Sequence, residues 1–352
     1  MTEWTSDFTG SFYNYLSPGC KICQQGASLV LFVTGLCGRD CFYCPLSDKR
    51  RGKDVVYANE RRANATDDII DEAYAIGALG TGITGGEPLL KRDFVIQSIR
   101  ALKKEFGEDH HIHLYTGVSP GHSTLNKLRQ AGLDEIRFHP DLSNTTHLDW
   151  LDKELTVAKS LGMVAGVEIP ALQPWPALIA VVRKSNAFLN LNQLEFSETN
   201  QCALNKRGFQ SLEFCCGAVG SEDVAKEHFM INDIKVHYCS SRFKDAVQLR
   251  ERLKRRAERT ARSFDLPTDD GTLIVGTIEP SKADGFDLDY TLKLLDTLRI
   301  PNDMYCIVGD QVEIAGWILS DITEELKDIG CNLNLVERYP IEDGPLLEMI
   351  PL

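Results

Sequence analysis

The stretch "DDIIDEAYAIGALGTGITGGEP", Asp67–Pro88, decides the fold. Apolar residues at helical spacing lead to a glycine, and a short apolar strand follows at once. The same order returns in "STLNKLRQAGLDEIRFHP" (123–140) and in "KELTVAKSLGMVAGVEIPAL" (153–172). Because the strands are nearly continuous apolar runs, we predict that both of their faces are buried. The glycines expected to cap the three helices are Gly80, Gly132 and Gly162.

Three more strand-like runs complete the pattern: "SLVLFVTG" (28–35), "HIHLYTG" (111–117) and "NLNQLEFSETN" (190–200). About six βα units result. This alternation predicts a parallel sheet with right-handed crossovers, either a barrel or a doubly wound sheet. We interpret the chain as an α/β protein with a partial (β/α)6 TIM-like barrel. Its chemistry is expected at the carboxyl ends of the strands.

The composition changes after the barrel. The stretch "KDAVQLRERLKRRAERTARSF" (244–264) predicts a long helix rich in Arg and Lys. It is either a solvated linker with Glu–Arg pairs or a patch that contacts phosphate or an acidic partner. After "DLPTDDG" (265–271) the order strand, helix, two strands, helix, strand predicts a small α+β ferredoxin-like domain, with "VEIAGWI" (312–318) as its third strand. The predicted divisions are an N-terminal extension with a CxxC (1–28), the barrel (29–240), a basic linker helix (241–267) and the ferredoxin-like domain (268–352).

The overall composition is that of an ordinary globular protein, with 43% hydrophobic and 25% charged residues among 352. A net charge of −13 gives no general attraction to nucleic acid, so an RNA site would have to be a local basic patch. No apolar run approaches the roughly 20 residues that span a bilayer, and the first ten residues lack a secretory pattern. We therefore expect a cytoplasmic protein with no membrane partner, whose eleven cysteines are reduced.

Three of these cysteines crowd the loop "TGLCGRDCFYCPLS" (34–47), directly behind an apolar strand. Their spacing is C-x3-C-x2-C, and no fourth ligand lies close by in the sequence. A structural zinc site needs four ligands, whereas a 4Fe–4S cluster anchored at three corners leaves one iron open. The spacing therefore favours a cluster held by Cys37, Cys41 and Cys44. A zinc variant and three unengaged thiols remain as alternatives.

A second motif, "TGGEP", lies one βα unit later, where a strand ends. Gly85 and Gly86 would let a ligand approach the backbone, and Glu87 could accept hydrogen bonds from a cationic amine. By itself, Gly-Gly-Glu-Pro is also a common turn sequence. Its position on the same rim as the cysteine loop favours a ligand site.

Together these motifs resemble those of the radical S-adenosylmethionine (radical SAM) superfamily, over roughly Leu29–Cys239. The superfamily's motifs are C-x3-C-x-aromatic-C, met by the cysteine loop with Tyr43 as the aromatic residue, and GGE. The strings "GCKICQQGASLVLFVTGLCGRDCFYCPLSDKR" and "HYCSSRFKDAVQLRERL" look more closely like a mostly archaeal family related to the pyruvate formate-lyase activating enzyme.

The resemblance implies a mechanism. The open iron of the 4Fe–4S cluster binds S-adenosylmethionine (SAM), one electron from an external reductant cleaves it, and a 5′-deoxyadenosyl radical removes hydrogen from the substrate. Glu87 would hold the SAM amino group, Gly85 and Gly86 would admit its backbone, Tyr43 would pack near the adenine, and Arg137 would contact the carboxylate. The other strand-end side chains expected at the pocket, or paired with one another below its rim, are Thr116, His139, Glu168, Glu195 and Glu198.

A second metal site is predicted from cysteines outside the motif. Cys20 and Cys23 form a CxxC ahead of the first strand, and Cys239 lies far downstream. Metal sites commonly take two ligands from one short segment and others from a distant one. Cys216 or His237 is the candidate fourth ligand. The metal would be zinc or an auxiliary 4Fe–4S cluster, and ordinary reduced cysteines are the alternative.

Three functions are compatible with these features. The first is an enzyme that removes hydrogen from a protein or peptide, as kinship with activating enzymes suggests. The second is a radical SAM enzyme that modifies tRNA, with the Arg-rich helix and the terminal domain as its binding parts. The third is a non-catalytic iron–sulfur or zinc scaffold, which the GGE motif disfavours because that motif has no purpose without SAM.

Overall fold

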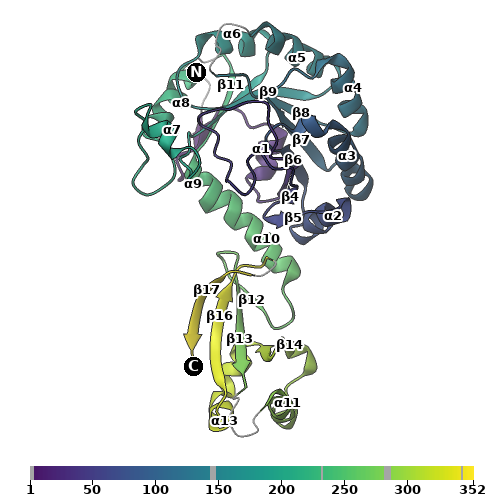
Figure 1. The fold of residues 1–352 in the computed structure, drawn as a ribbon, viewed down its shortest axis with the longest axis vertical. Coiled ribbons are helices and arrows are strands. Elements are labelled where there is room, and N and C mark those ends of the chain that lie inside the picture. The colour runs from purple at the N-terminus through teal and green to yellow at the C-terminus, as the bar shows by residue number, and fades with distance from the viewer. Residues whose placement is uncertain (1–3, 143–147, 231–232, 281–286, 342–343) are drawn as a thin grey trace. The chain divides into compact units, whose positions relative to one another are not determined.

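The computed structural model describes residues 4–142, 148–230, 233–280, 287–341 and 344–352 (Figure 1). The chain divides into two compact units. Unit 1 comprises Met1–Tyr74 and Ala78–Leu249, and unit 2 comprises Ala75–Gly77 and Arg250–Leu352.

Unit 1 is built on a curved sheet whose central strands are parallel. In spatial order these strands are β3 (Ser28–Phe32), β6 (Gly80–Thr84), β7 (His111–Thr116), β8 (Glu135–Phe138), β9 (Val164–Pro170), β10 (Phe188–Asn192) and β11 (Lys235–Cys239). Short antiparallel strands extend both edges: β4 (Tyr57–Ala58) and β5 (Arg61–Arg62) beyond β3, and β2 (Phe12–Tyr13) and β1 (Thr5–Ser6) beyond β11. The result is a partial barrel, with β11 as a seventh parallel strand that the sequence reading did not include.

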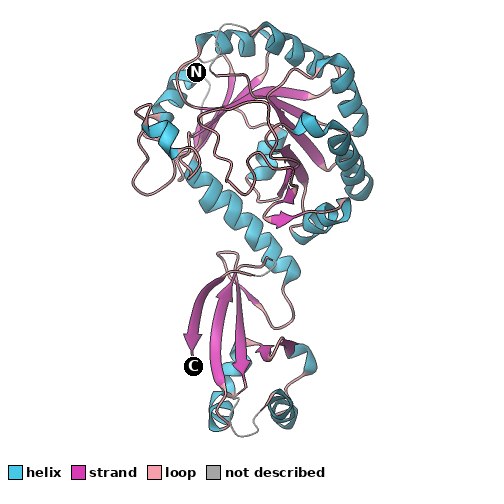
Figure 2. Cartoon of the chain, in the orientation of Figure 1, coloured by secondary structure: helices cyan, strands magenta, loops and turns pink. Residues whose placement is uncertain are grey.

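Helices follow the strands and form the outer layer around the sheet (Figure 2). They are α2 (Thr66–Ala75), α3 (Arg92–Phe106), α4 (Gly121–Ala131), α5 (Asp149–Ser160), α6 (Pro176–Lys184) and α8 (Ser221–Phe229). The shorter helical segments of this unit are α1 (Pro18–Cys23), η1 (Pro88–Lys91), α7 (Gln201–Asn205), α9 (Ser241–Phe243) and the π-helical turn η2 (Lys244–Leu249).

Glycines end two of the outer helices as the sequence predicts. Gly132 is in the left-handed conformation and its N–H bonds to carbonyls of the last turn of α4, while Gly162, at φ +81°, follows α5. The prediction for Gly80 was wrong. The helix α2 ends at Ala75, the left-handed glycine is Gly77, and Gly80 already begins strand β6.

The helix α1 lies on the inner side of the sheet, within the ring of strands (Figure 1). Ser17 caps its first turn, and a proline occupies its first position. Ser17 Oγ donates to Glu135 Oε1 at 2.9 Å, and the Gly19 N–H donates to Glu135 Oε2 at 3.1 Å. A side chain at Gly19 would collide with the Arg137 guanidinium, 2.6 Å away. Glycine therefore lets α1 sit directly on the residues that fill the barrel.

Unit 2 has the predicted ferredoxin-like topology. Its chain order is β13 (Leu273–Glu279), α11 (Leu288–Thr297), β14 (Tyr305–Val308), β15 (Gln311–Ile314), α12 (Gly316–Asp321), α13 (Thr323–Asp328) and β16 (Asn332–Arg338). The strands pair antiparallel in the order β14-β15-β13-β16, which is the arrangement of that fold. Its other elements are the helix α10 (Arg250–Thr260), the 3₁₀ turn η3 (Asn302–Met304), β12 (Leu266–Pro267) paired with β13, and β17 (Leu346–Pro351) at the outer edge.

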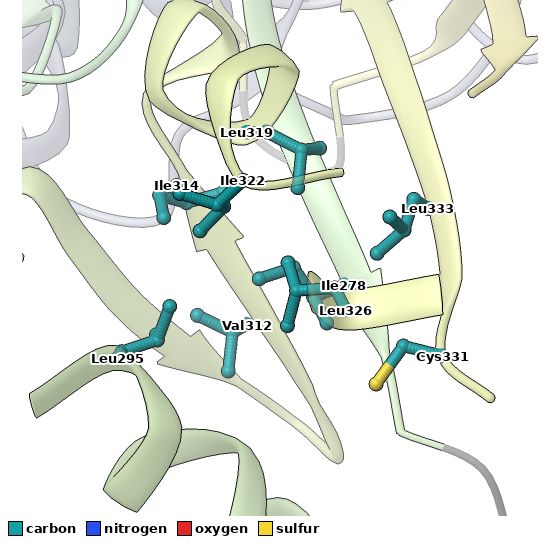
Figure 3. Close-up of a cluster of buried hydrophobic side chains, with 9 residues drawn as sticks. All are labelled: Ile278, Leu295, Val312, Ile314, Leu319, Ile322, Leu326, Cys331 and Leu333. Atoms are coloured by element: carbon teal, nitrogen blue, oxygen red, sulfur yellow. The ribbon is translucent and has the colours of Figure 1, made fainter. Parts of the chain in front are cut away.

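Side chains from the helices of unit 2 pack on one face of this sheet (Figure 3). Leu295, Leu319 and Leu326 come from α11, α12 and α13, and each is fully buried. Cys331 belongs to the same core. One prediction was wrong: "VEIAGWI" is not a continuous strand, because β15 ends at Ile314 and α12 begins at Gly316.

Candidate functional site

A cavity of about 600 Å³ occupies the interior of unit 1. Its wall combines the cysteine loop, the carboxyl ends of the strands and the inner helix α1. The predicted cofactor residues all line it: Tyr43, Gly85, Gly86, Glu87, Thr116, Arg137 and Glu168. The motif cysteines, by which we mean Cys37, Cys41 and Cys44, line it as well. His139 and Glu195 also face the cavity, whereas Glu198 is absent from its wall.

Backbone hydrogen bonds attach the cysteine loop to the end of β6. The Gly86 N–H donates to Thr34 O at 2.7 Å, and the Glu87 N–H donates to Leu36 O at 2.8 Å. A Cβ at Gly86 would lie 2.4 Å from Leu36 O, and one at Gly85 would lie 2.6 Å from Thr34 O. The glycine pair therefore admits the backbone of the cysteine loop. The sequence reading had assigned that space to SAM alone.

Arg39 is a second attachment that the sequence reading missed. It lies between the first two motif cysteines, and its guanidinium donates to His139 O at 2.6 Å and to Gly117 O. These carbonyls follow the ends of β8 and β7. Arg39 thus attaches the loop to two further strands. The only hint of this role in the sequence was the presence of a positively charged residue inside the cysteine motif.

Glu87 is buried and has a fixed orientation. Its carboxylate accepts from the Thr116 hydroxyl at 2.8 Å, from the Gly117 N–H at 2.7 Å and from the Leu89 N–H at 3.0 Å. These bonds join the end of β6 to the end of β7. A carboxylate held in this way at a cavity wall can accept a further hydrogen bond from a cationic ligand, because each oxygen has more than one lone pair.

Tyr43 is anchored through its phenol. The Nδ1 of His139 lies 2.8 Å from Glu168 O, so it carries the proton, and Nε2 accepts from the Tyr43 hydroxyl at 2.9 Å. Burial lowers the pKa of His139, which agrees with this neutral form. Burial also raises the pKa of Tyr43, so its hydroxyl remains protonated. Tyr43 belongs to a buried apolar cluster that also contains Leu194, and contact of its ring with the adenine stays a prediction.

Arg137 is buried between two carboxylates, one of the outcomes that the sequence reading left open. It bonds to Glu135 at 2.6 Å, to Glu168 at 2.7 Å, to the Tyr115 hydroxyl at 2.8 Å and to Ser17 Oγ at 3.0 Å. Burial alone would raise the pKa of Glu168, but the Arg137 charge and hydrogen bonds from two asparagines outweigh it and lower that pKa. These bonds already occupy Nε, Nη1 and Nη2 of Arg137. Its contact with a SAM carboxylate stays a prediction.

The donor set fits a 4Fe–4S cluster that binds SAM. Three thiols of one loop face a cavity, and a buried carboxylate stands on the same wall. In the described part of the chain, no three or more His, Cys, Asp or Glu side chains form a group that could hold one metal ion. A cluster does not require such a group, because in a cluster each thiolate binds a different iron.

The cysteines of the predicted second site divide into two groups. Cys20, Cys23 and Cys239, which we call the second cysteine set, line the same cavity as the motif cysteines, and so does His237. Cys216 is exposed and is not part of the cavity wall. The structure therefore does not bring Cys216 to the others, and of the two candidate fourth ligands it retains His237.

A partial parallel β/α barrel with three cysteines after its first parallel strand and Gly-Gly-Glu after its second has the design of a radical SAM enzyme. Residues 31–165 match the family model for the radical SAM superfamily, and residues 271–352 match a domain of unknown function, DUF8061. The chain is 37% identical, over 97% of its length, to "Putative glycyl-radical enzyme activating enzyme" of Methanocaldococcus jannaschii, 94% of which is covered. It belongs to the radical SAM superfamily, in one family with that relative. It is therefore an enzyme that uses a 4Fe–4S cluster and SAM.

Other relatives match over smaller parts. The chain is 26% identical to the PqqA peptide cyclase of Granulibacter bethesdensis, over 41% of this chain and 34% of that protein. Among solved structures, methylornithine synthase (PylB) matches with a TM-score of 0.40 and 12% identity, over 61% of this chain and 71% of that one. Within the described residues, no helix combines the length and the apolar character needed to cross a membrane.

Proposed function

We propose that this radical SAM enzyme removes a hydrogen atom from a protein or peptide substrate, as an activating enzyme does. The observation that carries the proposal is the likeness to the relative named as a glycyl-radical enzyme activating enzyme, which spans 97% of this chain and so includes both units. The cavity agrees with this assignment. At about 600 Å³ it lies within the range of about 300–1,000 Å³ for small-molecule sites, so a macromolecular substrate would insert only a short segment.

The roles of the chain's own residues follow from the geometry. The motif cysteines would bind three irons of the cluster, and Glu87 would accept hydrogen bonds from the SAM amino group. Arg39 and the glycine pair hold the cysteine loop against the strand ends, and α1 occupies the inside of the barrel. Once bound, the cluster and SAM supply reductive cleavage followed by hydrogen abstraction. The electron would come from an external one-electron reductant.

The tRNA alternative rests on the basic helix, and the contacts of that helix weaken it. In α10, Arg255 donates to the carbonyls of Ile76 and Gly77, and Arg256 donates to that of Pro340. Lys254 pairs with Asp269 at 2.9 Å. Cations that are engaged within their own unit are less available to phosphates. The net charge of −13 acts in the same direction.

The test measures 5′-deoxyadenosine release by the reconstituted enzyme under strong reduction, without oxygen. An extract that contains the substrate should raise the release above the substrate-free background. Protease treatment of the extract should abolish the increase, and ribonuclease should leave it intact. The opposite pattern would establish the tRNA alternative. An increase that survives both treatments would show a small-molecule substrate and overturn the proposal.

A further inference from the structure

The cavity contains more thiols than the known chemistry of the family requires. Besides the motif cysteines, the three members of the second cysteine set line it. No disulfide joins any of them. Two lie on α1, three residues apart and therefore on one helix face, and the third is the last residue of β11. Cys239 lies within electrostatic range of both Cys20 and Cys23.

Thiols that keep their S–H bond are a liability in this particular place. An S–H bond is weaker than most C–H bonds, so a thiol readily gives its hydrogen to a carbon radical. Three such groups inside the reaction cavity would compete with the substrate for every radical formed. A metal removes the difficulty, because coordination replaces the S–H bond with a metal–sulfur bond.

Unpartnered polar atoms mark the same region. The Nδ1 of His237 is buried and has no hydrogen-bond partner among the described residues, and neither has Oδ1 of Asn190. His237 precedes Cys239 by two residues on β11, so both side chains point to the same face of the sheet. Asn190 lies beside His237 on the neighbouring strand, and its Nδ2 donates to Cys20 Sγ at 3.3 Å. A buried acceptor or donor without a partner is costly unless a ligand completes it.

Charged side chains of both signs surround the second cysteine set. Arg137 and Lys244 both line the cavity, and each acts electrostatically on a cysteine of the set, Arg137 on Cys20 and Lys244 on Cys239. Arg137 is paired with Glu168 at 2.7 Å and Lys244 with Glu195 at 2.6 Å, so the case for a ligand here rests on the thiols and the unpartnered polar atoms.

The donors fit an iron–sulfur core better than a single zinc ion. Zinc needs four ligands that converge at about 2.0–2.3 Å, and no such group occurs among the described side chains. An iron–sulfur core places each ligand on its own iron, so the ligands remain apart. The motif cysteines, which belong to a known cluster family, are likewise not convergent.

We propose that Cys20, Cys23 and Cys239 bind a second 4Fe–4S cluster inside the barrel, with His237 as its fourth ligand. This inference does not depend on the identity of the substrate. It gives the N-terminal extension a function, because α1 carries two of the ligands into the barrel. It also explains why the cavity wall contains six cysteines.

The test counts iron, sulfide and zinc in anaerobically reconstituted protein. The wild type should hold about eight irons, and Cys37→Ala/Cys41→Ala/Cys44→Ala should keep about four, with a reduced-cluster EPR signal that SAM does not alter. Cys20→Ala/Cys23→Ala/Cys239→Ala should also keep about four, with a signal that SAM alters. The matched control is Cys215→Ala/Cys216→Ala, whose cysteines lie outside the cavity wall and which should keep about eight.

Two results would overturn the proposal. One is a wild type with about four irons and a motif variant with none, which would leave the second cysteine set as plain thiols. The other is about one zinc per chain that disappears with the second cysteine set. If that variant does not fold, the iron retained by the motif variant still decides the question. His237→Gln, a milder change, should shift the EPR signal of the second cluster alone. No substrate enters any of these measurements, so they are independent of the proposed function.

Discussion

Replacing Gly86 by alanine should loosen the cysteine loop. The added Cβ would lie 2.4 Å from the carbonyl oxygen of Leu36, whereas ordinary contacts begin at 3.4 Å, so the two backbones must separate by about 1 Å. Overpacking of this kind costs about 1–3 kcal/mol. The separation also strains the bonds from the Gly86 and Glu87 N–H groups, each contributing about 0.5–1.5 kcal/mol. We expect the attachment of the loop to weaken by about 2–6 kcal/mol in total.

The assay follows the SAM-sensitive EPR signal of the reduced cluster during challenge with an iron chelator. Since about 1.4 kcal/mol corresponds to a factor of ten, Gly86→Ala should lose this signal at least about tenfold faster than the wild type. The matched control is Gly38→Ala, a substitution in the same loop with no atom within 4 Å of the new Cβ. It should behave as the wild type does. If the two variants lose the EPR signal at equal rates and only Gly86→Ala binds SAM more weakly, the reasoning is refuted. The glycine pair would then serve to admit SAM and not the backbone of the cysteine loop.

Three further outcomes are expected. In Glu87→Gln an amide N–H would face the Thr116 hydroxyl and the Gly117 N–H, which now donate to a carboxylate. Equilibrium dialysis should then show SAM binding weakened about tenfold or more, which corresponds to a loss of about 1.5–3 kcal/mol. Burial and the charge of Lys103 lower the pKa of His110 from 6.5 to about 4 in the folded protein. As the pH falls, His110 is therefore protonated in the unfolded chain before it is protonated in the folded one. The free energy of unfolding should decrease as the pH falls from about 6.5 to 4. In His110→Gln this decrease should be smaller by about 3 kcal/mol, as measured by urea unfolding between pH 6.5 and 4. Leu326→Ala should destabilise unit 2 by about 2–5 kcal/mol in calorimetry while the iron content stays unchanged.

The partial barrel could be predicted from the sequence because each parallel strand is recognised from a short, local stretch of residues. Six of the seven parallel strands overlap a predicted strand, although the predicted run 190–200 shares only its first three residues with β10. The seventh, β11, reads "KVHYC" and was missed. His237 and Cys239 of this strand face the cavity, but so do His113 and Tyr115 of β7, which was predicted. Polar residues that face the site therefore do not by themselves explain why β11 was missed.

The contacts inside the site could not be predicted from the sequence, because they join distant segments. The GGE motif was found, but the reason for its glycines depends on the approach of Leu36, fifty residues earlier in the chain. Arg137 was expected to meet a ligand. Its bond to Glu135 joins two residues of β8, whereas its bond to Glu168 appears only when β9 is placed beside β8. The spacing of residues in the sequence identifies the candidates for the site. The pairing of the strands determines which side chains those candidates contact.

The interior of this partial barrel differs from that of a closed (β/α)8 barrel. Closed (β/α)8 barrels fill their interior with branched apolar side chains. Here Arg137, two glutamates, His113 and Asn190 occupy the middle of the sheet, and all five are buried or nearly so. A buried ion pair seldom stabilises a fold more than apolar packing of the same volume would. The polar interior is therefore best understood as the wall of the reaction cavity. The hydrogen bonds from Ser17 and Gly19 to the Glu135 carboxylate hold α1 against this wall, and the cysteines of α1 complete it.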